Sequence, residues 1–344
     1  MATISPQKTA VGTSEAAGLS PSPAPPERLS LFTRARLFLK IWAMKIQVKV
    51  LVGLMRTFNA SKLRKTLPTY TKRYEVRPML ENRVFIPSSA QPGAKHPLFM
   101  VIHGGGFVLM DPTMDDPINR KFADEHGFVV VSINYRKAPS YPFPTAVHDA
   151  AEIARAVLAD ADLPVDHSKV ALGGFSAGGN LTLAIAQLPG IKEKVKSLVP
   201  VYPVVDFTGR YEGEFRPGPD GKPDMLQDTA PLFNWAYLPE GQDRTDPLLS
   251  PICAGRDRLP QRIFFIGAEY DYLCFQAEIM ARKLAGLDET ADTGPDWEKN
   301  GIKWRMVPNV THGWTHMPKQ GEEEVQRKEG LEVLYKEIAD WLKQ

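Results

Sequence analysis

Two glycine-rich runs in this sequence carry residues that could perform acyl transfer. The run Gly-Phe-Ser-Ala-Gly at 174–178 sets a serine among small residues, and the run His-Gly-Gly-Gly-Phe at 103–107 contains three consecutive glycines. A serine on a sharp turn can attack a carbonyl carbon, and glycine amides can stabilise the oxyanion that forms. Together the two runs predict serine ester hydrolysis.

The serine run has the local pattern of a nucleophile on a strand-to-helix turn. Residues 170–174 are apolar and strand-like, whereas residues 177–187 have the apolar repeat of a helix. Ser176 then falls at the turn between the two elements, where its hydroxyl would be exposed above the helix N-terminus. The small residues Ala177 and Gly178 suit the crowding that such a turn imposes.

The glycine run follows the apolar stretch 98–102 and predicts an oxyanion hole. We expect the amides of Gly105 and Gly106 to be donors, with the Ala177 amide as the third. One such donor is worth about 3 kcal/mol of transition-state stabilisation. The run lacks the Lys-Ser/Thr of a Walker loop, and its spacing differs from Gly-x-Gly-x-x-Gly. We expect His103 to brace the loop through hydrogen bonds rather than to act as the catalytic base.

A serine hydroxyl needs a general base, and in this topology the histidine follows the serine and the carboxylate in chain order. Only His312 and His316 lie downstream of Ser176. His312 follows the strand-like residues 302–307 and precedes Gly313, which lets the loop turn, so we expect His312 to be the base. His316 lacks the glutamate of a His-Glu-x-x-His zinc helix, and we expect no metal site.

The histidine in turn needs a carboxylate that holds its tautomer. Residues 262–267 are typical of a buried strand, and Glu269 and Asp271 follow at the end where sites of parallel sheets are built. We expect Asp271 to be this carboxylate, because it lies at the start of the next helical run. Glu269 is the second candidate, with a loop-bracing ion pair as its other role. Asp206, after the strand-like residues 200–205, is the third.

A wider set of short stretches matches one known family. The stretches are 103–107, 134–136, 138–139, 143–144, 174–180 and 246–251, together with Asp271 and His312. On these residues the sequence resembles the hormone-sensitive-lipase-like branch of the α/β-hydrolases, over about residues 72–343. The resemblance implies hydrolysis of a carboxylic ester through an acyl-serine intermediate, without a metal or an organic cofactor. It implies a triad and three oxyanion donors, which are Ser176, Asp271 and His312, and Gly105, Gly106 and Ala177.

The sequence departs from the family pattern at several positions near these motifs. Lys137 and Ser140 stand where the family usually has leucine and glutamate, and Cys274 stands where an acidic residue often follows the catalytic aspartate. Residues 288–299 look like a polar insertion between Asp271 and His312. These departures concern substrate contacts and loop geometry more than the triad.

Composition and element order predict one large α/β domain with the α/β-hydrolase fold. The chain has 344 residues with 43% apolar content, and strand-like runs such as 128–133 and 197–201 alternate with helical segments. We expect a mostly parallel twisted sheet flanked by helices over residues 71–344. Residues 74–86 would supply antiparallel leading strands, 207–245 a lid loop and 322–342 a closing helix. The chain holds only two cysteines, so we expect a reducing compartment and a cytoplasmic location.

The N-terminal part divides into two unlike segments. Residues 1–30 are rich in Ser, Pro, Ala and Thr without an apolar signal core, and we expect a disordered tail. Residues 31–65 hold nine Lys or Arg and no acidic residue, in a chain whose net charge is +2. We expect a basic amphipathic helical segment over residues 31–70, with Arg34, Lys45, Lys49 and Arg56 as a basic stripe.

Two roles are open for this basic segment. In the first, it forms a cap over the site, with Trp42, Met44, Leu51 and Met55 lining an acyl or aromatic pocket. In the second, residues 31–65 make a peripheral contact with an intracellular membrane through the basic stripe. The two roles are compatible, and no run is long enough to span a bilayer.

The expected substrate is a small hydrophobic or acetylated ester, of a kind found in secondary metabolism. Two other functions use the same fold, namely a lyase or thioesterase of a biosynthetic pathway and a non-catalytic small-molecule receptor. We expect no nucleic-acid partner, because the positive charge is confined to one heavily apolar segment. The sequence does not predict the oligomeric state.

Overall fold

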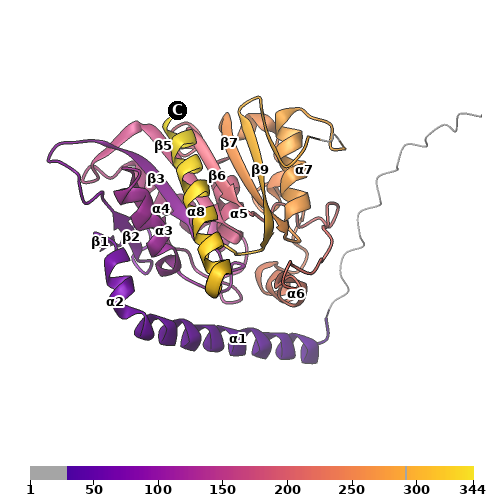
Figure 1. The fold of residues 1–344 in the computed structure, drawn as a ribbon. Coiled ribbons are helices and arrows are strands. Elements are labelled where there is room, and N and C mark those ends of the chain that lie inside the picture. The colour runs from indigo at the N-terminus through magenta and orange to yellow at the C-terminus, as the bar shows by residue number, and fades with distance from the viewer. Residues whose placement is uncertain (1–28, 291–292) are drawn as a thin grey trace, which may run out of the picture.

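The computed structural model of the chain describes residues 29–290 and 293–344, so the tail expected over residues 1–30 lies outside the described residues, apart from 29 and 30. The described part forms a nine-stranded sheet with the order β1-β2-β4-β3-β5-β6-β7-β9-β8 (Figure 1). The strands are β1 (Tyr70–Lys72), β2 (Asn82–Phe85), β3 (His96–Ile102), β4 (Val129–Ile133), β5 (Val165–Phe175), β6 (Ser197–Val201), β7 (Arg262–Tyr270), β8 (Asp296–Lys299) and β9 (Ile302–Thr311).

The middle of the sheet is parallel from β4 to β9, and antiparallel strands close both of its edges. The predicted mostly parallel sheet is therefore confirmed. Of the leading strands expected within residues 74–86, β2 lies in that range, while β1 begins earlier, at Tyr70. At the other edge, the supposed polar insertion 288–299 contributes β8, which pairs with β9.

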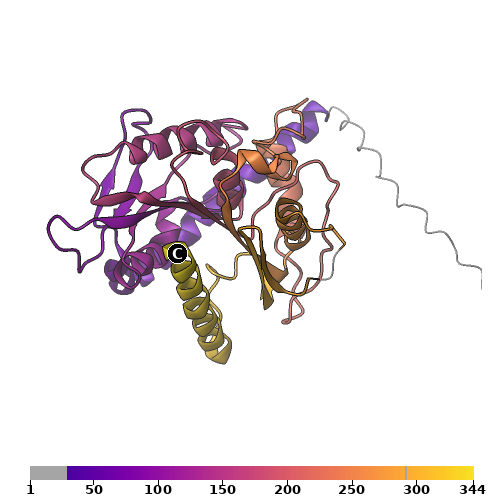
Figure 2. The same ribbon diagram turned by 90° about the horizontal axis from the view of Figure 1, so that it is seen from above.

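Helices cover both faces of the sheet (Figure 2). The helices of the structure are α1 (Leu31–Phe58), α2 (Ala60–Leu63), α3 (Asp116–Asp124), α4 (Thr145–Leu158), α5 (Ala177–Ile185), α6 (Leu226–Tyr237), α7 (Cys274–Ala285) and α8 (Gly321–Lys343). Helices α4, α5 and α7 pack on one face, and α3 and α8 pack on the other. Successive residues of β3 alternate between these two cores, with Leu98 and Met100 in the first and Phe99 and Val101 in the second. A strand buried on both faces explains why its sequence is a continuous apolar run.

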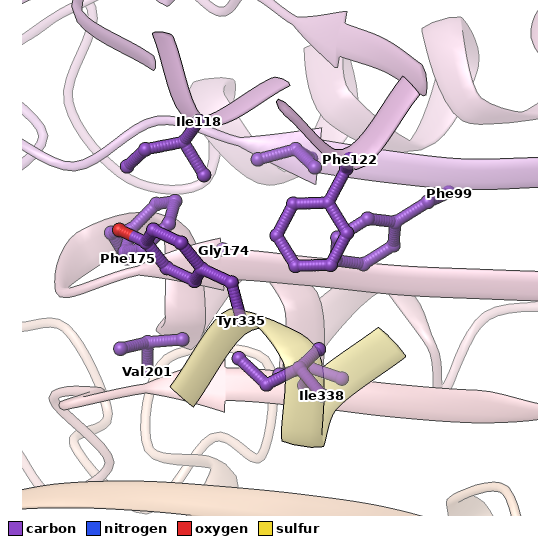
Figure 3. A pocket seen from close by; sticks show the side chains of 10 residues that line it. Phe99, Ile118, Phe122, Gly174, Phe175, Val201, Tyr335 and Ile338 are labelled. Atoms are coloured by element: carbon purple, nitrogen blue, oxygen red, sulfur yellow. The ribbon is translucent and has the colours of Figure 1, made fainter. Parts of the chain in front are cut away.

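The second core packs directly beneath the serine run. Figure 3 looks into a small apolar pocket there, where Phe99, Phe122 and Ile338 come from β3, α3 and α8. Gly174 and Phe175, the last two residues of β5, line the same pocket. The end of β5 therefore packs against α3 and α8, which fixes its position.

Helix α1 lies along one edge of the molecule, beside α6 (Figure 1). Ser30 caps its start, since the Ser30 hydroxyl accepts the Thr33 amide at 3.1 Å. Ile41 is fully buried, and Leu37 and Met44 pack against the same core. Of the four side chains expected to line a pocket, Met44 alone packs there, while the others, Trp42, Leu51 and Met55, are exposed.

Helix α2 and a short 3-10 turn (Arg64–Thr66) link α1 to β1. Among residues 29–290 and 293–344, no helix combines the length and the apolar character that crossing a bilayer requires.

Candidate active site

Ser176 lies on the turn between β5 and α5, as the sequence pattern predicted. Its φ of 53° and ψ of −116° put a non-glycine residue in a strained region of backbone space. The Ser176 amide donates to the Val201 carbonyl at 2.9 Å, which fixes the turn to β6. A Cβ at Gly178 would overlap the Ile102 carbonyl oxygen, so the turn requires glycine at this position.

The triple-glycine loop packs against this turn, backbone to backbone. A Cβ at Gly104 would lie 3.5 Å from the Ser176 Cβ. Gly105 and Gly106 have φ values of +111° and +60°, which L side chains rarely adopt. Ala177 is the first residue of α5, where amides lack an acceptor within the helix. The three residues expected to supply oxyanion donors thus belong to two adjoining backbone segments.

His103 supports the loop from its buried side. Its Nδ1 lies 2.7 Å from the Gly104 carbonyl oxygen, and its ring stacks on Tyr135 with 4.3 Å between centroids. The Tyr135 hydroxyl donates to the His103 carbonyl at 3.2 Å. Burial, and then the nearby charge of Lys137, lowers the pKa of His103 to about 3. A neutral imidazole that donates to Gly104 agrees with the bracing role expected for His103.

Lys137, which stands where the family usually has leucine, lies under the same loop. Its ammonium donates to the Asn134 side-chain oxygen at 2.8 Å and to the Tyr135 carbonyl at 2.7 Å. Burial lowers the pKa of Lys137 to about 8. The Lys137 ammonium, which stands in place of an apolar side chain, therefore has its hydrogen bonds satisfied by neighbouring residues.

The structure brings together the serine, the histidine and the aspartate that the sequence singled out. The His312 Nε2 lies 2.9 Å from the Ser176 Oγ, and the His312 Nδ1 lies 2.8 Å from the Asp271 Oδ2. The other Asp271 oxygen accepts the Leu273 amide at 2.8 Å, which fixes the carboxylate. His312 and Asp271 are both buried.

The electrostatics around His312 favour its protonated form. Burial lowers the pKa of His312, but the charge and hydrogen bond of Asp271, with a further contribution from Asp224, outweigh it. The pKa of His312 is therefore raised above its ordinary value of 6.5. An imidazole of raised basicity, hydrogen-bonded to a hydroxyl, can accept the hydroxyl proton.

The two other carboxylates considered for this role are occupied elsewhere. The Glu269 Oε2 accepts the Asn309 amide at 2.8 Å, so Glu269 braces a loop, through a hydrogen bond to a backbone amide where an ion pair was expected. Asp206 accepts the amides of Thr208 and Tyr211 at 2.7 and 3.0 Å. Of the three candidates, Asp271 is the one that hydrogen-bonds to His312.

A second histidine–aspartate pair lies next to the first, and the sequence analysis missed it. The His316 Nε2 lies 2.8 Å from the buried Asp115 Oδ1, and the His316 Nδ1 lies 2.8 Å from the Thr315 hydroxyl. The Tyr202 hydroxyl bonds to the Thr315 hydroxyl and lies 3.3 Å from the His316 Nδ1. Asp115 and His316 are 201 residues apart, so local sequence carries no signal for this pair.

The segment predicted as a lid, 207–245, contains α6 and lies on the oxyanion loop. A Cβ at Gly106 would overlap the Phe233 ring of α6, which shows how closely the two segments approach. Phe107 stacks on Tyr237, the last residue of α6, with 3.8 Å between ring centroids. The close approach leaves room for glycine alone at position 106.

The same segment also contacts the loops that carry Asp271 and His312. The Asp224 Oδ2 accepts the Tyr272 amide at 2.6 Å, and Phe215 stacks on the Tyr272 ring at 3.9 Å. The Met225 sulfur would lie 3.8 Å from a Cβ at Gly313. Residues 207–245 therefore contact the oxyanion loop and the loops that carry Asp271 and His312.

Comparison with known proteins agrees with the observed fold. A family profile described as alpha/beta hydrolase fold matches residues 99–314. An esterase of Pyrobaculum calidifontis has a similar solved structure, with a TM-score of 0.68, 27% sequence identity and coverage of 92% of this chain and 98% of the other.

Two relatives with similar sequences carry names of different kinds, one an enzyme and one a receptor. An arylesterase of Saccharolobus solfataricus is 36% identical over 194 residues, which are 54% of this chain and 61% of the relative. A gibberellin receptor of Oryza sativa subsp. japonica is 31% identical over 250 residues, which are 69% of this chain and 68% of the relative. The chain thus spans about two thirds of the length of these relatives.

Proposed function

Because the chain belongs to the hormone-sensitive-lipase-like branch of the alpha/beta hydrolase fold family, we propose that it is a serine carboxylesterase with Ser176, His312 and Asp271 as its triad. The observation that carries the proposal is the continuous hydrogen-bonded chain from the Asp271 carboxylate through His312 to the Ser176 hydroxyl. This arrangement is the one that nucleophilic catalysis by serine requires.

In the first half of the reaction, the Ser176 Oγ attacks the ester carbonyl carbon while the His312 Nε2 takes its proton. The imidazolium that forms is stabilised by the Asp271 carboxylate, which also holds the Nδ1–H tautomer. The carbonyl oxygen becomes an oxyanion, which the amides of Gly105, Gly106 and Ala177 stabilise. Each of these donors contributes about 3 kcal/mol, or two to three orders of magnitude in rate.

The tetrahedral intermediate then collapses to the acyl-serine. The bond to the alkoxide breaks, and His312 gives its proton to the leaving alcohol. A water molecule attacks the acyl-serine in the same way, with His312 as the base, and releases the carboxylic acid and free Ser176.

Residues 31–70 and 207–245 form the cap of this site, and residues 71–344 form the catalytic domain.

We propose a small hydrophobic or acetylated ester as the substrate. Apolar side chains of the segment 207–245 support this class, since Phe233 lies against Gly106 and Met225 lies near Gly313. The two free thiols, Cys253 and Cys274, are consistent with a reducing compartment such as the cytoplasm.

The decisive test is the Ser176→Ala variant, assayed on a chain-length series of p-nitrophenyl esters and on acetylated aromatic compounds. We expect kcat to fall by roughly four to six orders of magnitude, because the nucleophile is lost. A fluorophosphonate should label the intact protein at Ser176 and leave the variant unlabelled. A variant that hydrolyses these esters at the rate of the intact protein would overturn the proposal.

A small-molecule receptor is the second candidate, and the likeness to the gibberellin receptor supports it. A receptor would bind its ligand without turnover, so fluorophosphonate labelling and product release separate it from an esterase. A lyase or thioesterase would use the same triad on another substrate. Product analysis distinguishes both from an esterase. An esterase releases an alcohol, a lyase releases an alkene by elimination, and a thioesterase releases a thiol.

A further inference from the structure

Helix α1 presents two unlike faces, of which one packs on the protein. Leu37, Ile41 and Met44 lie on the packed face. The opposite face carries apolar side chains that are more than half exposed: Phe32 (81%), Leu39 (68%), Ile46 (61%), Val50 (56%) and Leu54 (51%). These residues recur at intervals of four and seven, which places them in one stripe along the helix. Leu39, Ile46 and Val50 lie roughly 140 to 180° around the helix from Ile41.

The charges of α1 border this stripe. Within residues 31–58 the helix has six Lys or Arg and no acidic residue. Arg36 and Lys40 flank the stripe on one side and Lys49 flanks it on the other, and all three are exposed. An apolar stripe between exposed cations is the pattern of a helix that lies in the plane of an anionic membrane surface.

In the structure, the surface of α1 that could meet a membrane differs from the basic stripe that the sequence predicted for this role. Two cations of the expected basic stripe bind the protein instead, since the Lys45 ammonium donates to the Ala138 carbonyl at 2.8 Å and Arg34 pairs with Glu240 at 3.5 Å. The surface opposite the packed face is therefore the apolar stripe, and Lys49 of the expected basic stripe is exposed at its border. The packing of Ile41, Leu37 and Met44 and the hydrogen bond of Lys45 seat the helix so that this stripe points outward.

We propose that α1 docks the protein on an anionic lipid bilayer, with the stripe Phe32, Leu39, Ile46, Val50 and Leu54 buried among the acyl chains and Arg36, Lys40 and Lys49 at the headgroups. Charge favours this occupant over a second copy of the chain. Two copies joined through the stripe would bring their cations together without an acidic residue of α1 to pair with them. Anionic headgroups supply that missing charge.

The docked face lies at the end of the molecule that holds the candidate site. Helix α1 packs beside α6 (Figure 1), and Phe233 of α6 lies against Gly106 of the oxyanion loop. Ala138, which Lys45 contacts, donates its amide to the Phe107 carbonyl at 3.0 Å. A bilayer against α1 is therefore next to the segment that covers Ser176.

Co-sedimentation of the full chain with vesicles tests the proposal. We compare phosphatidylcholine vesicles with phosphatidylcholine vesicles that also contain phosphatidylglycerol. The intact protein should bind the anionic vesicles, and high salt should weaken the binding. The Leu39→Glu/Ile46→Glu variant should lower the partition coefficient at least about tenfold, because two carboxylates enter the apolar stripe.

The matched control is Val325→Glu/Val333→Glu, which adds the same two charges at exposed valines of α8 and should bind vesicles like the intact protein. A Lys40→Gln/Lys49→Gln variant should lose most of the preference for anionic vesicles. Circular dichroism verifies that each variant is folded, and hydrolysis of a water-soluble ester without vesicles stays a separate test of the proposed function. Equal binding by the two glutamate variants would overturn the proposal. The proposal would also be overturned if the intact protein did not bind vesicles and was a dimer that the Leu39→Glu/Ile46→Glu change converted to a monomer.

Discussion

The Tyr202 ring meets the His312 imidazole edge to face, with 5.0 Å between the ring centroids. The Tyr202 hydroxyl bonds to Thr315 and contacts His316, which lies against Asp115. Tyr202 therefore connects the second histidine–aspartate pair to the ring that faces Ser176. This contact supports His312 from the protein interior, since Tyr202 is fully buried.

A Tyr202→Phe variant keeps the ring and removes the hydroxyl. We expect the free energy of unfolding to fall by about 1 to 3 kcal/mol, because buried polar groups lose a partner. We expect kcat to fall roughly tenfold with little change in KM, because a slightly displaced His312 affects the reaction more than binding. Urea unfolding and steady-state kinetics measure the two effects. Tyr335→Phe is the matched control, since the buried Tyr335 hydroxyl has no partner among the described residues, and it should leave kcat unchanged.

The pH profile of kcat/KM should fall on the acid side as His312 becomes protonated. Only the neutral imidazole accepts the Ser176 proton, so activity is lost as the pH drops through the pKa of His312. Because that pKa is raised, the midpoint of the acid limb should lie above 6.5. Asp271→Asn removes the charge that raises the pKa, so the midpoint should move to lower pH. The rate should also fall by about four orders of magnitude through loss of the correct tautomer.

The neighbouring carboxylate supplies the control for this profile. Glu269→Gln removes a charge two residues from Asp271, but Glu269 bonds to the Asn309 amide and not to His312. The acid limb of the Glu269→Gln variant should coincide with that of the intact protein. An acid limb that stays in place in Asp271→Asn and shifts in Glu269→Gln would contradict the assignment of the triad carboxylate.

Gly105→Ala should remove most of the activity while leaving the protein folded. Gly105 has a φ of +111°, and an added Cβ would overlap the Leu109 carbonyl oxygen. The loop must shift, and displacement of one oxyanion donor costs roughly two to three orders of magnitude in kcat. Kinetics on a p-nitrophenyl ester, with circular dichroism as the folding check, measure this loss.

Gly53→Ala is the glycine control, because a Cβ at Gly53 has no atom within 4 Å. Gly53 lies inside α1 and is exposed, so alanine should raise the free energy of unfolding by up to about 1 kcal/mol through its better helix propensity. Its kcat should equal that of the intact protein. Equal kcat in Gly105→Ala and Gly53→Ala would show that the triple-glycine loop does not carry oxyanion donors.

Sequence alone located the parts of the site that depend on local geometry. Ser176 was placed because its turn needs small neighbours and lies between a strand pattern and a helix pattern, and chain order then singled out His312. The choice of Asp271 over Glu269 was more difficult, since both follow the strand-like residues 262–267 in the sequence, although β7 extends to Tyr270 and includes Glu269. The structure separates them by their partners, His312 for Asp271 and the Asn309 amide for Glu269. The catalytic roles of these residues stay predictions.

Features that depend on contacts between distant segments could not be predicted in this way. The helical wheel placed Arg34, Lys45 and Lys49 in one stripe, but only the structure shows that Arg34 and Lys45 contact Glu240 and Ala138 while Lys49 stays exposed. The pair of His316 with Asp115 joins residues from opposite ends of the domain and has no local pattern. Residues 288–299 looked like a polar insertion because the strand that they contain, β8 (Asp296–Lys299), is an exposed edge strand without the apolar run of a buried one.

Ile41 and Ile46 of α1 offer a direct test of how this helix is seated. Ile41 is fully buried against the core, while Ile46 is 61% exposed on the opposite face. Ile41→Ala should lower the free energy of unfolding by about 2 to 4 kcal/mol, because it leaves a cavity beneath α1. Ile46→Ala should change it by less than about 0.5 kcal/mol, because a mostly exposed side chain loses little packing. Urea unfolding of both variants without lipid measures the difference. Equal effects would mean that α1 does not pack on the domain through Ile41, and the outward direction of the Leu39 and Ile46 side chains would then lose its basis.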